Sequence, residues 1–304
     1  MMKKINHVIE SQQFDIKLIN SIFTSADKLE KRPAQSLKGK IMASLFYEPS
    51  TRTRFSFESA MLRLGGSVIT TENAREFSSA IKGETLEDST RVISNYADVI
   101  VMRHYEQGAS VRASVVSTIP IVNAGDGTGQ HPTQALLDLY TIKRELGKID
   151  GAKVAFVGDL KNGRTVRSLS YLLGKYKNMT IYFVSPKALA VEGDIKEYLT
   201  KHKTAYEELE DLDAVLPKVD VLYQTRIQKE RFKTEKEYKK YKGCYKIDAR
   251  TVTKMKAKAI IMHPLPRVDE LSTEVDASPK AAYFKQVKYG LLVRMALLQY
   301  VLGK

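Results

Sequence analysis

The residues of this sequence with the clearest chemical potential fall in five short clusters, each directly after a run of apolar residues. In the first cluster, Ser50, Thr51, Arg52 and Thr53 open a helical pattern of apolar residues. A helix start presents unpaired backbone N–H groups and the positive end of the helix dipole, and hydroxyl and guanidinium groups add donors suited to phosphate. Such residues also cap helices. Because two threonines and an arginine exceed the needs of a cap, we predict a phosphate site here.

The second and third clusters precede further helical patterns. His131 stands directly before a proline at a strand-to-helix junction, where α/β sheets place their sites, and Gln134 follows one turn later with an amide that donates and accepts. The segment 158–165 has the spacing of a nucleotide-binding P-loop, with Arg164 at the lysine position. Asp159 would put a carboxylate where phosphate oxygens should lie. An enzyme that binds ATP with Mg²⁺ through this loop is an alternative interpretation.

The last two clusters are loops that also follow apolar runs. Arg226 and Gln228 lie in a charged loop, a composition equally typical of a solvated face. Pro264 and Leu265 belong to a loop with two prolines, whose extended backbone leaves carbonyls that cannot all pair within a sheet. Such carbonyls can accept hydrogen bonds from an N–H₂ group. Lys82 lies in a polar segment and, by itself, would be interpreted as surface.

Composition narrows the class of protein. The chain has 304 residues, enough for two domains, and its 43% hydrophobic and 28% charged residues are ordinary for a soluble globular protein. Cys244 is the only cysteine, which excludes an intramolecular disulfide and a cysteine-based zinc site within one chain. The apolar runs have the length of strands, so we expect a cytoplasmic protein without a membrane partner. The net charge of +14 suits anionic ligands, although a lysine-rich proteome would give the same balance.

The elements that must position these clusters alternate between buried-type strands and helices. This alternation predicts an α/β fold of two domains, each a mostly parallel sheet flanked by helices, joined by interdomain helices. The predicted strands are 41–46, 68–70, 98–102, 120–123, 154–157, 179–184, 219–223 and 259–262. The predicted helices are 50–65, 132–146, 164–177 and 289–302, and 70–83 is predicted to be a polar loop. The predicted domains are 1–132 and 150–287, with a helix at 133–149 between them and the segment 288–304 packing back on the first domain.

Taken together and in this order, the five clusters resemble the transcarbamoylase family over essentially the whole chain. The run from Ser50 to Arg54 is shared by that family. The branch that uses ornithine typically has Lys in place of Glu48, His-Pro-Cys-Gln in place of 131–134 and His-Cys-Leu-Pro in place of 263–266. This chain follows the aspartate-using branch at each point. The resemblance implies that the amine of aspartate attacks carbamoyl phosphate to give N-carbamoyl-L-aspartate and phosphate, a step of pyrimidine biosynthesis that needs no metal and no organic cofactor.

The resemblance also implies roles by motif position. The ligands of carbamoyl phosphate would be Ser50, Thr51, Arg52, Thr53, Arg103, His131, Gln134 and the carbonyls of Pro264 and Leu265. The aspartate ligands would be Lys82, Arg164, Arg226 and Gln228. The catalytic residues would be Arg52, Thr53, Lys82, Arg103, His131 and Gln134. Ser78 and Lys82 would also bind carbamoyl phosphate, and both would come from the neighbouring subunit of a homotrimer with shared active sites. Glu48 would tie Arg164 and Arg231 when the domains close.

The partners that the resemblance implies are the two substrates and the other subunits, with separate regulatory chains as a further partner that the family allows. We expect no nucleic acid among them. Lysines and tyrosines do interleave in the segment 229–246, but no aromatic RNA-binding motif accompanies them, and a mobile lid beside the aspartate site has the same composition. The chain departs from many family members at Tyr105, Asn162, Arg167 and 128–129, and none of these changes removes an implied ligand.

Overall fold

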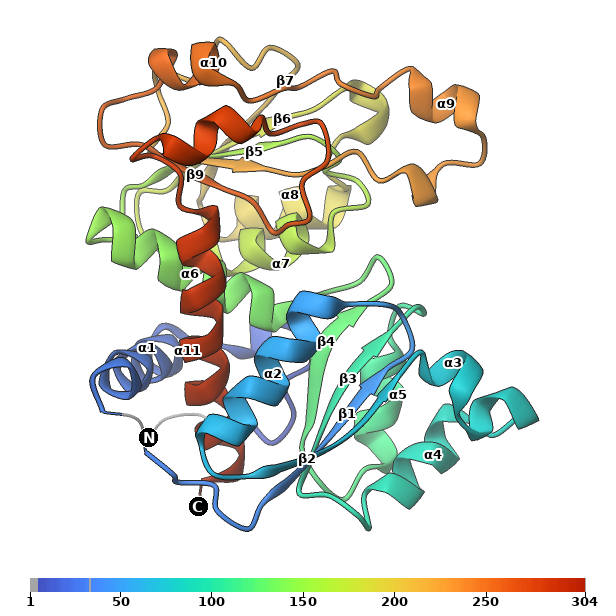
Figure 1. The fold of residues 1–304 in the computed structure, drawn as a ribbon. Helices are drawn as coiled ribbons and strands as arrows, with labels where there is room; N and C mark the ends of the chain where they lie inside the picture. The colour runs from blue at the N-terminus through green and yellow to red at the C-terminus, as the bar shows by residue number, and fades with distance from the viewer. Residues whose placement is uncertain (1–4, 33, 304) are drawn as a thin grey trace. The chain divides into compact units, whose positions relative to one another are not determined.

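A computed structural model describes residues 5–32 and 34–303. The chain forms two compact units, Met1–Leu137 together with Lys288–Lys304, and Asp138–Val287. Each unit holds a parallel sheet flanked by helices (Figure 1), which confirms the predicted fold class. The helices α6 (Pro132–Leu146) and α11 (Tyr283–Leu302) each contribute residues to both units. Among the described helices, none combines the length and apolar character needed to cross a membrane.

The first unit is built on a four-stranded parallel sheet in the order β2-β1-β3-β4. Its strands are β1 (Ile41–Phe46), β2 (Ser67–Glu72), β3 (Val99–His104) and β4 (Ile121–Asp126). Its other helices are α1 (Ile16–Lys31), α2 (Thr51–Arg63), α3 (Ala74–Phe77), α4 (Leu86–Ile93) and α5 (Ala109–Val116), with 3₁₀ turns η1 (Ser11–Gln13) and η2 (Ser79–Lys82). Because all four strands are parallel, their carboxyl ends meet at one edge, where the loops to the following helices begin.

Alternation along the strands assigns the two faces of this sheet. Ala43 and Leu45 in β1 belong to an apolar cluster that also includes Ala109 and Ala113 of α5. Ser44, between them, points to the opposite face and donates a hydrogen bond to Glu58 of α2 at 3.0 Å. Successive strand residues face opposite sides, so the sheet is covered by α5 on one face and α2 on the other. The C-terminal part of α11 packs beside α1 and α2, where Arg294 lies over the Phe57 ring at 4.9 Å and Gln299 accepts from Ser25.

The second unit is built on a five-stranded parallel sheet in the order β7-β6-β5-β8-β9. Its strands are β5 (Lys153–Val157), β6 (Thr180–Val184), β7 (Ala205–Leu209), β8 (Val221–Gln224) and β9 (Ile260–Met262). Its helices are α7 (Arg164–Leu173), α8 (Gly193–Lys201), α9 (Glu235–Lys239) and α10 (Ala249–Lys254), with 3₁₀ turns η3 (Lys187–Leu189), η4 (Lys229–Arg231) and η5 (Thr273–Ala277). Phe156 on the central strand stacks on Phe183 at 5.8 Å and meets Tyr223 edge-on at 5.4 Å, so aromatic packing joins three adjacent strands.

The structure differs from the sequence prediction in several segments. The helix predicted at 164–177 ends at Leu173, with Gly174 as its C-cap. The segment predicted as a polar loop at 70–83 contains the end of β2 and the short helices α3 and η2. The last helix begins at Tyr283, six residues before the predicted start at Tyr289. The short helices within 70–83 have mixed polarity and no clear periodicity, so the pattern of apolar residues does not reveal them.

Candidate active site

The predicted phosphate cluster lies at the N-terminus of α2, directly after the carboxyl end of β1. Ser50 occupies the N-cap position, but its hydroxyl makes no capping hydrogen bond. The apolar residues of the helix, including Phe57 and Met61, are buried, and Thr51 and Arg52 are exposed at its start. A serine that does not cap, followed by exposed donors at a helix start, is the arrangement expected of an anion site rather than of a capped helix end.

Arg103 reaches the same edge from β3. It pairs with Phe46 in the sheet register, and its carbonyl accepts the Tyr47 N–H at 2.9 Å. Its guanidinium holds the Glu48 carboxylate through Nε at 3.0 Å and a terminal nitrogen at 2.8 Å. The arginine predicted to bind phosphate is therefore already shaped to hold an oxyanion. The sequence did not indicate this ion pair between Arg103 and Glu48. The resemblance instead implies that Glu48 contacts Arg164 and Arg231 of the second unit.

His131 and Gln134 stand at the start of α6, after β4, and both are buried. The Thr133 hydroxyl lies 3.4 Å from His131 Nδ1. The preceding loop is braced by Asp126, whose carboxylate accepts the Gln130 N–H at 2.8 Å and, through its other oxygen, the Gly108 N–H at 2.9 Å. The Asp126 carboxylate therefore joins the loops after β3 and β4. This contact fixes the loop that leads to the His131 imidazole.

Gly127 allows these two loops to approach closely. Its φ of +50° is rare for residues with a side chain, and a Cβ at this position would lie 2.7 Å from the Tyr105 carbonyl oxygen. Only glycine fits both the conformation and the space. The strand-end loops of the first unit therefore gather the helix starts that carry Arg52 and His131 along one edge of the sheet.

Ser78 and Lys82 lie apart from these residues in sequence, on the short helices after β2. The Ser78 hydroxyl donates to the Ala74 carbonyl. Lys82 is exposed, and no carboxylate in the described part of the chain forms an ion pair with it. Among the residues that the structure describes, Lys82 forms no hydrogen bond or ion pair with Arg52 or His131. Its role in a shared active site stays a prediction.

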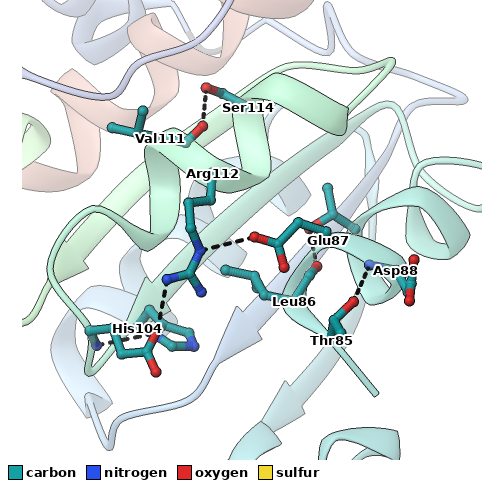
Figure 2. A network of polar contacts seen from close by, with 10 residues as sticks. Thr85, Leu86, Glu87, Asp88, His104, Val111, Arg112 and Ser114 are labelled. Atoms are coloured by element: carbon teal, nitrogen blue, oxygen red, sulfur yellow. Dashed lines mark hydrogen bonds and ion pairs between the residues drawn. The ribbon is translucent and has the colours of Figure 1, made fainter. Parts of the chain in front are cut away.

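The helix that follows Lys82 is firmly anchored, as Figure 2 shows. Arg112 of α5 bonds Glu87 of α4 at 2.9 Å and Glu106, in the loop after β3, at 3.0 Å. The Thr85 hydroxyl caps α4 by accepting the Asp88 N–H at 3.1 Å. The exposed segment that carries Lys82 therefore leads directly into an anchored helix.

In the second unit, the loops after β5 and β8 touch at Gly158. Its φ is +117°, and a Cβ there would lie 2.4 Å from the Thr225 carbonyl oxygen. The contact aligns the loop that leads to Arg164, at the start of α7, with the loop that carries Arg226 and Gln228. Gln228 donates from Nε2 to the Asn162 carbonyl at 3.2 Å. Three of the predicted aspartate ligands thus lie on two neighbouring strand-end loops.

Arg226 is held in a forked contact by Glu230, with one bond at 3.0 Å and a second, shorter one. Burial alone would lower the pKa of Arg226, but the hydrogen bonds and charge of Glu230 outweigh it and raise that pKa. Burial tends to raise the pKa of Glu230, but the hydrogen bond and charge of Arg226 outweigh burial and lower that pKa. The guanidinium is thus permanently charged and presents the geometry that binds a carboxylate.

The P-loop alternative does not agree with the loop at 158–165. The Asp159 side chain is fully buried inside this loop, and its oxygens accept from the backbone N–H of Asn162 at 3.0 Å and from the Asn162 side chain at 3.1 Å. Burial raises the pKa of Asp159, and the hydrogen bonds from Asn162 only partly offset this effect. A carboxylate therefore fills the space in which a P-loop would hold phosphate oxygens.

The loop after β9 carries Pro264 and Leu265. Neither carbonyl accepts a hydrogen bond from any residue that the structure describes. His263 at the head of this loop is buried and hydrogen bonds Glu270 at 2.8 Å. Burial tends to raise the pKa of Glu270, but the bond from His263 and backbone N–H groups outweigh it and leave that pKa lowered. Within the described residues, no group of three His, Cys, Asp or Glu side chains is placed to hold a metal ion.

Both sheets thus present rigid strand-end loops that carry donors for oxyanions, and the first adds a helix start of the phosphate-binding kind. Two family models cover the chain: the aspartate/ornithine carbamoyltransferase carbamoyl-P binding domain over residues 6–144, and the Asp/Orn binding domain of the same family over residues 150–301. The chain belongs to the aspartate/ornithine carbamoyltransferase family.

Individual relatives of this chain show which branch of the family it resembles most. Aspartate carbamoyltransferase 2, chloroplastic, from Pisum sativum is 58% identical over 98% of this chain and 79% of its own length. The crystallised catalytic subunit of Methanocaldococcus jannaschii aspartate transcarbamoylase is 54% identical over 98% of both chains, with a TM-score of 0.89. The Trypanosoma cruzi aspartate transcarbamoylase in complex with carbamoyl phosphate and aspartate is 43% identical over 99% of this chain and 98% of that chain, with a TM-score of 0.94.

Proposed function

We infer that this chain is an enzyme that transfers the carbamoyl group of carbamoyl phosphate to the amine of L-aspartate, which yields N-carbamoyl-L-aspartate and phosphate in pyrimidine biosynthesis. The observation that carries this inference is the similarity to aspartate carbamoyltransferases over 98% of the chain. The placement of the predicted ligands agrees with it, because they lie on strand-end loops in each unit.

The first unit binds the phosphate end of carbamoyl phosphate in this proposal. The N–H groups at the start of α2, the hydroxyls of Ser50, Thr51 and Thr53, and the guanidinium groups of Arg52 and Arg103 supply the donors. Arg103 exchanges the Glu48 carboxylate for phosphate oxygens. A helix dipole and two fixed cations stabilise a doubly charged phosphate without a metal ion.

The carbonyl group is activated by donors aimed at its oxygen. Thr53, Arg103 and His131 take this role, and each such donor contributes roughly 3–4 kcal/mol in well-studied oxyanion sites. Gln134 and the carbonyls of Pro264 and Leu265 hold the carbamoyl nitrogen. The rigid loops after β3 and β4 support this role because a donor contributes most when it needs no reorganisation.

The second unit binds aspartate. Arg164 takes the α-carboxylate, and Arg226 with Gln228 takes the β-carboxylate, because a guanidinium fork matches a carboxylate in shape and charge. The amine attacks the carbonyl carbon, a C–N bond forms and the C–O bond to phosphate breaks. The leaving phosphate accepts the proton that the amine loses, so no side chain is required as nucleophile or base. Both substrates are held in line, which supplies much of the remaining rate.

We propose further that the enzyme acts in the cytoplasm as a homotrimer with shared active sites, in which Ser78 and Lys82 serve the neighbouring subunit. Two observations support a partner copy. Lys82 and Ile81 are exposed on the segment that precedes the anchored helix α4. On α2 and β2, the large apolar side chains of Phe55, Leu62 and Ile69 are 55%, 59% and 42% exposed, and a second copy of the chain would cover such apolar surface. Regulatory chains are a further partner that this proposal allows.

The test is a turnover assay with carbamoyl phosphate against L-aspartate, L-ornithine and N-acetylornithine. We expect product only with L-aspartate, and activity that persists in the presence of a metal chelator. Turnover of either ornithine compound, or no turnover with any amine, would contradict the proposal. A calorimetric titration with Mg²⁺ and ATP checks the P-loop alternative, for which we expect no binding heat.

A further inference from the structure

His263 is held by both nitrogens of its ring. The Leu265 N–H donates to Nδ1 at 2.8 Å, and Nε2 lies 2.8 Å from Glu270 Oε1. A backbone N–H can only donate, so Nδ1 is the acceptor and the ring proton sits on Nε2, which donates to the carboxylate. The side chains of His263 and Glu270 are 1% and 5% exposed, so water competes for neither bond.

Leu265, whose N–H donates to the His263 ring, has an unusual backbone conformation. Leu265 has a φ of +55°, in the left-handed region that leucine seldom adopts. Such a conformation persists only where the surroundings fix it. The residue before it is a proline, which has no N–H to donate, so the Leu265 N–H is the first amide of the loop that can be tied down. The imidazole thus sets the direction of the peptide planes whose carbonyls belong to Pro264 and Leu265.

The base of this loop is fixed as well. The His263 backbone N–H donates to Gln286 Oε1 at 3.1 Å, and Gln286 Nε2 donates to Asp138 at 2.5 Å. The second oxygen of Asp138 accepts from the Tyr223 hydroxyl at 2.7 Å. All four side chains are buried. The His263 imidazole is therefore anchored to the core of the second unit. It stays in place if the loop that carries Pro264 and Leu265 shifts.

We propose that His263 is a positioning residue that, oriented by Glu270, aims the carbonyls of Pro264 and Leu265 at the N–H₂ group of the donor substrate. This inference rests on the proposed function. It makes the His263–Glu270 pair a determinant of donor specificity, because two fixed acceptors favour an acyl phosphate with an N–H₂ group over one with a methyl group in its place. The pair does not touch phosphate and does not contribute to phosphate binding.

The experiment compares carbamoyl phosphate with acetyl phosphate, which has a methyl group where carbamoyl phosphate has N–H₂. Dissociation constants of both, and of inorganic phosphate, are measured on the full-length protein. In His263→Gln, an amide occupies the Nε2 position and the acceptor for the Leu265 N–H is lost. We expect the preference for carbamoyl phosphate to fall about tenfold, the effect of one or two lost hydrogen bonds, with acetyl phosphate and inorganic phosphate binding unchanged.

Three further variants sharpen the test. His263→Asn keeps an oxygen near the Nδ1 position, so it should retain more of the preference than His263→Gln does. His202→Gln, the same change at an exposed histidine of the second unit, should have no effect. Glu270→Gln keeps an acceptor for Nε2 with less orienting power, and we expect a smaller loss that falls on carbamoyl phosphate alone.

The outcomes separate this inference from the proposed function. If wild-type protein turns over carbamoyl phosphate and aspartate but the His263 variants keep the full preference, the inference is wrong and the function stands. Equal weakening of all three ligands would show that His263 only maintains the fold, which also overturns it. If the wild-type protein neither prefers carbamoyl phosphate nor turns it over, the proposed function itself has failed.

Discussion

At the scale of single residues, Arg226 is the clearest test of acceptor binding. Its guanidinium is held in fork geometry by Glu230, on a loop that Gly158 fixes against its neighbour. In Arg226→Ala we expect the KM for aspartate to rise about 100-fold, because a forked bond to a charged group is lost. The dissociation constant of carbamoyl phosphate should change less than twofold.

The matched control is Arg250→Ala, at an exposed arginine of the same unit, which should change neither constant. Steady-state kinetics and equilibrium binding measure both. Weaker binding of carbamoyl phosphate in Arg226→Ala would show that the residue does not serve the acceptor alone.

A second prediction at this scale concerns Asp98, which accepts from Lys40 Nζ at 2.7 Å and from the first amide of β1, that of Ile41, at 2.8 Å. Burial tends to raise the pKa of Asp98, but these hydrogen bonds outweigh it and lower that pKa. A lowered pKa means that the ionised form stabilises the fold above the unfolded pKa of about 3.9, and that this stabilisation is lost as the pH falls toward the folded pKa.

Asp98→Asn should therefore lower the free energy of unfolding by about 1 kcal/mol at pH 7, a value that allows for the partial exposure of the carboxyl. Urea unfolding at pH 7 and at pH 3 should show this difference shrinking at the lower pH. A difference that stays constant between the two would mean that the ionised carboxyl is not its source.

At the scale of elements, Gly158 joins the two loops that carry the predicted aspartate ligands. In Gly158→Ala, the new Cβ meets the Thr225 carbonyl and φ is unfavourable, so we expect a loss of about 3 kcal/mol of stability and a raised KM for aspartate. Gly151→Ala is the control, because φ there is also positive, at +76°, but nothing lies within 4 Å. It should lose only about 1 kcal/mol. Thermal unfolding of both variants provides the comparison. Equal losses would show that the contact with Thr225 is not the cause.

The elements also show what the sequence could reveal. Buried central strands such as β5 and β6 were predicted because both faces are apolar, which leaves a continuous apolar run. The edge strand β7 was not predicted, since two of its five residues are charged and its burial is partial. The N-terminal helix α1 was also missed, although its buried residues recur at helical spacing.

For the site, the sequence could indicate which residue types follow each strand but not which of them pair. The carboxylates that hold Arg103 and Arg226 come from Glu48 and Glu230. Glu230 stands four residues after its arginine, a helical spacing that could have suggested the pair. Glu48 and Arg103 are far apart in the chain, and only the register of β1 and β3 brings them together.

At the scale of the whole molecule, the proposed trimer predicts that inactive subunits complement each other. Lys82→Ala and His131→Ala chains should each be nearly inactive. When they are mixed, dissociated and reassociated, some sites combine an intact Lys82 from one subunit with an intact His131 from another. Those sites should recover near wild-type turnover, so the mixture regains a sizeable fraction of activity. If hybrids confirmed by mass stay as inactive as the parents, Lys82 does not act across subunits.

The arginine–carboxylate pairs have a consequence for the response of the enzyme to salt. In the proposed function, aspartate and phosphate replace carboxylates that the protein already holds at Arg103 and Arg226, so binding would be an exchange of anions rather than the neutralisation of bare cations. Despite the net charge of +14, the KM for aspartate should rise only a few-fold between 50 and 300 mM salt, whereas Glu230→Gln should make it rise more steeply. In this proposal, Glu48 and Glu230 neutralise the local charge of Arg103 and Arg226, which lets a strongly basic protein select its substrates from the many other anions in solution.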